Sequence, residues 1–259
     1  MLWSFRGSIV FAVAGIISDV VQGKYFSLES LNSVLVILWA GVVFVNTILP
    51  GPKKTRDFYD VLAPDEKHLC VLVADVSGHG IGAAILASML KIAFASQQDS
   101  FSDPGRVLAG MNRALCDKLD SNFVTAACVF LDLESGRLRY AAAGHPPMFL
   151  CRKDDPEIRE FGDNGLILGP FPNVVFPVTT TALQAGDRVI LYTDGVIEAR
   201  NNSGSFFEDA GFKRFIQDHR SLPPNSFADA LLDHLSVWTG KASGKAFADD
   251  LTLMILDKT

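Results

Sequence analysis

The sequence predicts a layered α+β domain preceded by an apolar, helical N-terminal segment. After residue 56, short apolar runs typical of buried strands alternate with turn residues, and a few longer segments have helical composition. Hairpin connections join several of these runs, which favours antiparallel layers over a doubly wound parallel sheet. The mean hydropathy of +0.25 is high, and much of the apolar excess lies before Pro50. We therefore expect two parts, residues 1–50 and residues 51–259.

The composition excludes some classes of partner and site. With 259 residues, the chain can form one sizeable domain and an appendage. Its net charge of −6 provides no basic surface, so we expect no nucleic-acid partner. The four cysteines form no C-x-x-C pair and have no neighbouring histidines at zinc spacing. We expect free thiols in a reducing compartment, with disulfides left open.

Two apolar runs, residues 2–21 and 34–49, dominate the N-terminal segment. Each approaches the ~20 residues that a helix needs to cross about 30 Å of hydrocarbon. Lys53, Lys54 and Arg56 follow the second run, and such positive charge tends to stay on the cytoplasmic side. We expect residues 1–50 to form a transmembrane helical hairpin that holds the following domain, in the cytoplasm, at the cytoplasmic membrane.

The alternative for this segment is a pair of buried helices in a soluble protein. Asp19 favours the alternative, because a carboxylate inside hydrocarbon is energetically costly. A cleavable signal peptide fits less well than either, since no small-x-small site follows the first run.

From residue 69 onward, each expected element has a local signal. The apolar run at 69–75 predicts a buried strand, and the glycines that follow separate it from a well-covered helix at 81–96. Asp103-Pro104 is a capping residue followed by proline, which predicts a helix at 105–119. The turn residues 134–137 predict a hairpin between strands at 123–133 and 138–143. The remaining expected elements are strands at 147–151, 174–181, 188–193 and 249–256 and helices at 208–219 and 226–237.

Four aspartates stand where apolar strands meet turns: Asp57, Asp75, Asp194 and Asp249. One aspartate in such a position is usually a turn or cap residue, but four of them at strand ends far apart in sequence indicate a shared site. Mg²⁺ and Mn²⁺ prefer oxygen ligands, and two such ions about 3.5–4 Å apart can hold a hydroxide and the phosphoryl oxygens of a substrate. The pattern predicts a two-metal hydrolytic site.

Six motifs, in a fixed order, connect the chain to a known family. They are DFYDV at 57–61, ADVSGHGIGAAILAS at 74–88, AAGHPP at 142–147, LGP at 168–170, GDRVILYTDGVIEARN at 186–201 and DDLTLMIL at 249–256. With them, residues 55–258 resemble the metal-dependent (PPM-type) serine/threonine protein phosphatases, in the bacterial branch named after the stage II sporulation phosphatase, SpoIIE. The resemblance implies a four-layer αββα sandwich with two Mn²⁺ or Mg²⁺ ions at one end of two packed sheets. It also implies hydrolysis of phosphoserine or phosphothreonine by a metal-activated water.

The resemblance gives catalytic and metal-ligating roles to Asp57, Asp75, Asp194 and Asp249. Asp75 is expected to bridge the two ions, and Val76 is expected to contribute its backbone carbonyl as a further metal ligand.

Two details of this assignment rest on the residues themselves. Asp249 is preferred to Asp250, since strand alternation would place it on one face with Leu251, Leu253 and Ile255, which should point into the sandwich. His79 is expected to pack at the start of a helix rather than to act in catalysis, and His145 is expected to fix a turn rather than to bind a ligand.

The chain departs from the family around its first metal aspartate. Family members carry two glycines before it, whereas Thr55 and Arg56 stand here. The Arg56 guanidinium would either repel a metal ion or bind substrate phosphate, and both readings stay open. The strand that the family carries ahead of this motif is also missing, unless residues 42–49 replace it as a strand, in which case the membrane hairpin fails.

The function that we expect is that of a protein phosphatase in signal transduction. Family analogy suggests a phosphorylated regulatory protein as substrate, such as an anti-sigma-factor antagonist in sigma-factor regulation, and leaves a homodimer open. The alternative is a catalytically impaired pseudo-phosphatase that acts as a membrane-associated protein-binding module, which Arg56 and the shortened N-terminus favour. A small-molecule phosphohydrolase using the same metals is a third reading.

Overall fold

Two antiparallel β-sheets form the centre of the domain. The computed structural model describes residues 33–39, 42–49, 57–78, 81–119, 122–240 and 249–259. Sheet A has the strand order β1-β2-β11-β10-β7-β8, and sheet B has the order β3-β4-β5-β6-β9. The strands of sheet A are β1 (Ser33–Trp39), β2 (Val42–Leu49), β11 (Leu251–Lys258), β10 (Arg188–Tyr192), β7 (Met148–Cys151) and β8 (Ile158–Phe161). Those of sheet B are β3 (Asp57–Leu62), β4 (His68–Val76), β5 (Val124–Asp132), β6 (Arg137–Ala143) and β9 (Thr179–Ala182).

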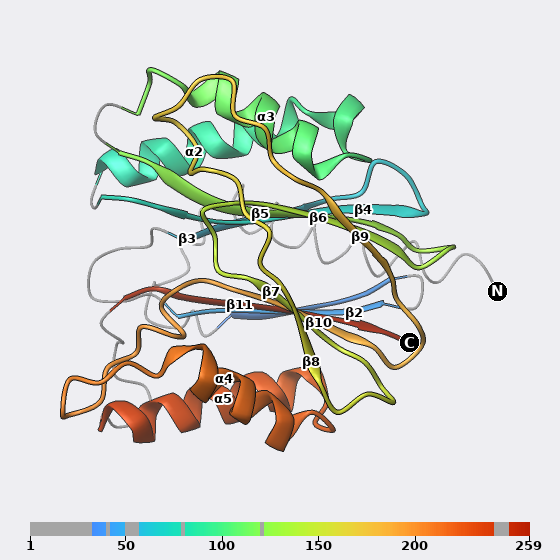
Figure 1. Ribbon diagram of the computed structural model, residues 1–259, viewed down its shortest axis with the longest axis vertical. Coiled ribbons are helices and arrows are strands. Elements are labelled where there is room, and N and C mark those ends of the chain that lie inside the picture. The colour runs from blue at the N-terminus through green and yellow to red at the C-terminus, as the bar shows by residue number, and fades with distance from the viewer. Residues whose placement is uncertain (1–32, 40–41, 50–56, 79–80, 120–121, 241–248) are drawn as a thin grey trace, which may run out of the picture. The chain divides into compact units, whose positions relative to one another are not determined.

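Helices cover the outer face of each sheet, as Figure 1 shows. The helices α2 (Ile81–Ala95) and α3 (Pro104–Leu115) lie over sheet B, with the short 3₁₀ helix η1 (Gln98–Ser100) between them in the chain. The helices α4 (Glu208–His219) and α5 (Pro224–Thr239) lie over sheet A. As predicted, Asp103 caps α3 by accepting a hydrogen bond from the Arg106 backbone N–H, and Pro104 is the first residue of α3. The predicted four-layer α+β sandwich is confirmed.

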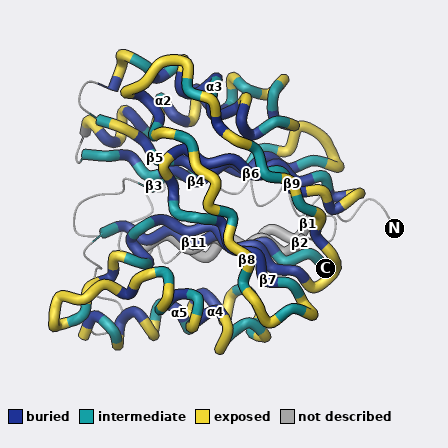
Figure 2. The backbone as a smooth tube through the Cα atoms, viewed as in Figure 1, coloured by how far each residue is buried: buried dark blue, intermediate teal, exposed yellow. Residues whose placement is uncertain are grey.

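Apolar side chains fill the three spaces between the four layers. Leu72, Leu90 and Met111 belong to the core between sheet B and its helices. Side chains alternate along a strand, so the neighbours of these residues in sequence have the opposite parity and point to the other face. Val73 on β4 is one of them, and it packs with Leu191 and Met254 in the core between the two sheets. The third core lies between sheet A and α4/α5 and includes Tyr192, Phe212 and Leu253. Figure 2 shows most described strand residues as buried, whereas the helices alternate between buried and exposed residues.

The second apolar run is not helical, so the predicted hairpin of transmembrane helices is wrong for residues 34–49. These residues form β1 and β2, which pair with each other from Ser33↔Ile48 to Trp39↔Val42. β2 then pairs along β11 from Leu49↔Leu251 to Val42↔Lys258, and thereby provides the strand ahead of β3 that the alternative interpretation required. The run is rich in valine and isoleucine, whose branched side chains favour strands, and its length alone cannot separate one helix from two strands.

The first apolar run, residues 2–21, lies outside the described residues. In the part of the chain that the structure describes, no helix is long and apolar enough to cross a membrane. The predicted membrane location stays a prediction.

Candidate active site

Two of the four predicted aspartates face each other across neighbouring strands. Asp57 is the first residue of β3, and its register partner on the antiparallel strand β4 is Asp75. Asp57 has the parity of Tyr59 and Val61, which pack on the core between the sheets, and Asp75 has the parity of the buried Val73 in the same core. Both carboxylates therefore lie on the inner face of sheet B, at one edge of the sandwich.

A hydrogen bond joins this edge of sheet B to sheet A. Thr193, which directly follows β10, donates its hydroxyl to Asp57 Oδ2 at 2.7 Å. The same hydroxyl oxygen accepts the Thr252 backbone N–H at 2.9 Å, while the Thr193 backbone N–H donates to the Thr252 carbonyl at 3.0 Å. Because Thr193 is fully buried, one hydroxyl fixes the orientation of Asp57 and the meeting point of β10 and β11.

The surroundings of Asp57 disfavour its charged form. Burial raises its pKa from 3.8 to about 7, and the negative charges of Asp75 and Asp250 add to the increase. The hydroxyls of Thr252 and Thr193 act in the opposite direction, by stabilising the carboxylate. Without a cation, this cluster of carboxylates retains a proton near neutral pH.

Asp194 lies in a turn that packs tightly against the start of β11. Its backbone carbonyl accepts the Glu198 N–H at 2.8 Å, which closes the turn. A Cβ atom on the next residue, Gly195, would lie 1.9 Å from the Asp250 carbonyl oxygen, so only glycine permits this approach. The close packing places the Asp194 segment directly beside the segment that carries Asp249 and Asp250.

The alternation argument that favoured Asp249 is contradicted by the structure. Leu251, Leu253 and Ile255 belong to the core under α4 and α5, whereas Met254 and Leu256 face sheet B. Asp250 therefore has the parity of the inner face. It is 2% exposed, and its charge contributes to the raised pKa of Asp57.

Only its position in the sequence motif now favours Asp249 over Asp250 as a metal ligand. Its carboxylate accepts the Asp250 backbone N–H at 2.9 Å. Asp250 is the residue near Asp57 that sequence reasoning set aside. Thr252, a hydroxyl residue within an apolar run, lies on the same face of the strand and was the signal that could have identified it.

His145 lies beside the site as a buried, neutral side chain. Its Nδ1 atom is 3.1 Å from the hydroxyl of Thr125, and Thr125 is the register partner of Asp75. Burial lowers the pKa of His145 to about 3, so the imidazole is uncharged at neutral pH. Its backbone carbonyl accepts a hydrogen bond from the Asn164 side chain at 2.6 Å. These contacts match the expected role in fixing a turn, whereas His79 lies outside the described residues.

The predicted ligands are not gathered into a finished metal site. Among the residues that the structure describes, no group of three or more histidine, cysteine, aspartate or glutamate side chains is close enough to hold one ion. The structure brings Asp57, Asp75 and Asp250 within electrostatic range and positions Asp194 and Asp249 on adjoining segments. The metal-ligating roles of Asp57, Asp75, Val76, Asp194 and Asp249 stay predictions.

Comparison with known proteins decides the family. The sequence model of Stage II sporulation protein E (SpoIIE) matches residues 65–259. The chain belongs to the SpoIIE family. The matched segment starts after β3, so the SpoIIE match covers Asp75, Asp194 and Asp249 but leaves out Asp57, which its pairing with Asp75 brings to the site.

Three relatives illustrate the similarity. Phosphoserine phosphatase RsbU of Bacillus subtilis (strain 168) is 28% identical over 209 residues, which cover 80% of this chain and 61% of RsbU. A structure of RsbU and RsbW domains from Mycobacterium tuberculosis is 27% identical with a TM-score of 0.68, and the match covers 90% of this chain and 64% of that one. RsbX in complex with magnesium shares the fold, with 18% identity, a TM-score of 0.66 and coverage of 88% of this chain and 100% of RsbX. The chain thus spans about three fifths of the length of RsbU.

Proposed function

We propose that the chain is a metal-dependent phosphatase that hydrolyses phosphoserine or phosphothreonine in a regulatory protein. The observation that carries the proposal is the edge of the sandwich at which Asp57 and Asp75 face each other and Thr193 ties Asp57 to sheet A. The similarity to RsbU, which is named a phosphoserine phosphatase, supports the reaction. The magnesium in the RsbX structure supports the use of divalent ions.

The donor chemistry at this edge suits Mn²⁺ or Mg²⁺. Carboxylate oxygens are the ligands that hard divalent ions prefer. Burial, with a smaller contribution from the charges of Asp75 and Asp250, raises the pKa of Asp57, and a bound cation would offset both effects. We assign two ions to Asp57, Asp75, Asp194, Asp249 and the backbone carbonyl of Val76. When bound, the ions would supply Lewis-acid activation of water and charge neutralisation at the phosphoryl group.

The protein residues position this chemistry. Thr193 holds Asp57 Oδ2, which restricts the carboxylate to one orientation before any ligand arrives. His145 remains neutral and interacts with Thr125 beside Asp75, so it adds no positive charge that would compete with a cation. Gly195 allows the segments of Asp194 and Asp250 to approach each other. In this proposal no side chain acts as a nucleophile.

The partner that we propose is a phosphorylated regulatory protein, for example an anti-sigma-factor antagonist. The relative with an RsbW domain beside its RsbU domain supports a regulatory setting of this kind. Attachment to the cytoplasmic membrane through residues 1–32 is part of the proposal, and release of the protein by carbonate extraction of membranes would refute it. Homodimer formation is left to measurement of the mass in solution.

Hydrolysis of p-nitrophenyl phosphate by the full chain tests the proposal. A shorter protein starting at residue 51 would lack β1 and β2, so the full chain is required. We expect Mn²⁺-dependent hydrolysis that Asp75→Asn or Asp194→Asn abolishes. Asp60→Asn is the matched control, because Asp60 is on β3 but has the parity of Phe58 and Leu62, which pack under the helices of sheet B.

A folded sample that shows no activity with any divalent metal ion would refute the proposal of an active enzyme and would support the pseudo-phosphatase alternative. Recovery of activity by Thr55→Gly combined with Arg56→Gly would then identify the departure that disabled the site.

A further inference from the structure

A cavity of about 510 Å³ opens at the end of sheet A opposite to Asp57. Arg188, the first residue of β10, and its register partner Asp257 on β11 line it. The active-site edge lies at the other end of the same two strands, where Tyr192 pairs with Leu253. The two ends are four residue steps apart along β10, or about 13 Å at ~3.3 Å per residue. The cavity is therefore separate from the proposed metal site.

Basic side chains dominate the wall of this cavity. Arg152, Lys153, Arg188 and Arg220 line it, together with a single carboxylate, Asp257. Such a concentration of positive charge is unexpected in a chain with a net charge of −6. Whether it can attract an anion depends on which of these charges are already neutralised.

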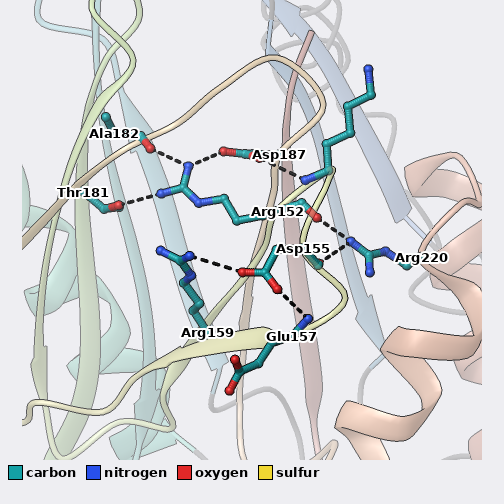
Figure 3. A network of polar contacts seen from close by, with 9 residues as sticks. Arg152, Asp155, Glu157, Arg159, Thr181, Ala182, Asp187 and Arg220 are labelled. Atoms are coloured by element: carbon teal, nitrogen blue, oxygen red, sulfur yellow. Dashed lines mark hydrogen bonds and ion pairs between the residues drawn. The ribbon is translucent and has the colours of Figure 1, made fainter.

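Two of the four cations are paired with carboxylates. Arg188 makes a bidentate ion pair with Asp257, with two contacts of 2.7 Å. Arg152 donates to Asp187, which is 1% exposed, and also to Thr181 and the Ala182 carbonyl (Figure 3). These two ion pairs form the rigid base of the cavity and leave little net charge of their own.

The other two cations form no ion pair with a carboxylate among the described residues. Arg220 donates from one guanidinium nitrogen to the backbone carbonyls of Arg152 and Asp155, which are neutral acceptors (Figure 3). The Asp155 carboxylate pairs with Arg159 instead. The Lys153 backbone N–H donates to Asp187, and its ammonium group has no hydrogen bond to any residue that the structure describes. The cavity thus carries two positive charges that form no ion pair with a carboxylate in the described part of the chain.

A further polar group at the cavity is unsatisfied. Arg188 is 7% exposed, and its buried Nη1 atom has no hydrogen-bond partner among the residues that the structure describes. The wall also includes Leu222, which can contact an uncharged part of a ligand.

We propose that this cavity binds a phosphate monoester of about the size of a mononucleotide. A phosphate monoester carries about −1.5 to −2 charges near pH 7, which balances the charges of Lys153 and Arg220. Both side chains are suited to binding phosphate. The planar guanidinium of arginine can donate two parallel hydrogen bonds to phosphate oxygens, and the ammonium group of lysine sits on a flexible chain that can move to reach them. Inorganic phosphate would leave most of the volume empty, whereas cavities of about 300–1,000 Å³ accommodate small organic ligands.

Calorimetric titration of the full chain with adenosine monophosphate, in EDTA, tests the proposal without any contribution from bound metal ions. We expect one saturable site, no binding of adenosine, and weaker binding of inorganic phosphate than of the nucleotide. Lys153→Ala and Arg220→Ala should each weaken nucleotide binding by about tenfold or more, since each removes a charge-assisted contact. Lys91→Ala is the control, because Lys91 is an exposed lysine on α2 over the other sheet.

Several outcomes would overturn the proposal. They are the absence of saturable nucleotide binding, an equal loss in Lys91→Ala, loss of binding in Asp75→Asn, and binding of inorganic phosphate as tight as that of the nucleotide. Thermal unfolding of each variant checks that it is folded. If Arg220→Ala is unfolded, the exposed Lys153 still decides the question, because Lys153→Glu should abolish binding and retention of binding would refute the site.

Discussion

Replacing Asp57 by asparagine should stabilise the metal-free protein at pH 8. The raised pKa of Asp57, about 7 against 3.8, means that the folded protein holds this proton more tightly than the unfolded chain does. The resulting stability is fully present below pH 3.8 and is lost as the pH rises to about 7. About three pKa units correspond to ~4 kcal/mol as an upper bound, and partial exposure of the carboxyl to water reduces the expected effect to ~2 kcal/mol. Asparagine carries no charge and can still accept the hydrogen bond from Thr193.

Urea unfolding in EDTA between pH 4 and pH 8 measures this effect. The free energy of unfolding of Asp57→Asn should exceed that of the wild type by an amount that grows from about pH 4 to about pH 7 and then stays constant. Asp60→Asn, on the opposite face of β3, should show no such pH-dependent gain. A gain that is independent of pH, or a variant that is less stable than the wild type at pH 8, would refute the electrostatic reasoning.

Three further substitutions test the packing around the site and the cavity. Thr193→Val removes the hydrogen bond between the sheets and should destabilise the protein by about 1.5–3 kcal/mol and weaken Mn²⁺ binding in calorimetry, whereas Thr193→Ser should preserve both. Gly195→Ala places a Cβ atom 1.9 Å from the Asp250 carbonyl oxygen and should abolish phosphatase activity. Gly82→Ala is the control, because no atom lies within 4 Å of its added Cβ, and it should be neutral or slightly stabilising in thermal unfolding. Asp187→Ala leaves a partly buried arginine without its carboxylate and should cost about 3 kcal/mol in urea unfolding, and a loss below about 1 kcal/mol would contradict that reasoning.

Local signals were sufficient for much of the fold after residue 69. The capping residue and proline at 103–104 located the start of α3, and the turn at 134–137 located the β5–β6 hairpin, in which Gly136 has a φ of +69°. Such signals act within a few residues and do not depend on the rest of the chain. β8, by contrast, was not predicted. Its four residues are intermediate or exposed and lie at the edge of sheet A, so the sequence has no apolar run there. β9 is shorter than its predicted range of 174–181, which again lies at a sheet edge.

Contacts between the sheets were beyond what sequence patterns can provide. The motifs identified Asp57 and Asp75 as members of one site, and the register of β3 and β4 brings them together. The hydrogen bond from Thr193 to Asp57 joins residues 136 positions apart and depends on how the two sheets pack. The basic cavity likewise combines the ends of β7 and β11 with the loop between α4 and α5, segments that no local pattern relates.

β11 shows why periodicity could not choose between Asp249 and Asp250. Sheet A is covered by sheet B on one side and by α4 and α5 on the other, so residues of both parities from Leu251 to Leu256 are buried. Alternation separates two faces only when one of them is polar. The informative residue was Thr252, whose buried hydroxyl lies beside Asp57 and fixes the inner parity of the strand. Asp250 shares that parity, so Asp250→Asn is expected to lower the pKa of Asp57 and to alter Mn²⁺ binding in a calorimetric titration. A titration identical to that of the wild type would instead leave Asp249 as the sole ligand contributed by this segment.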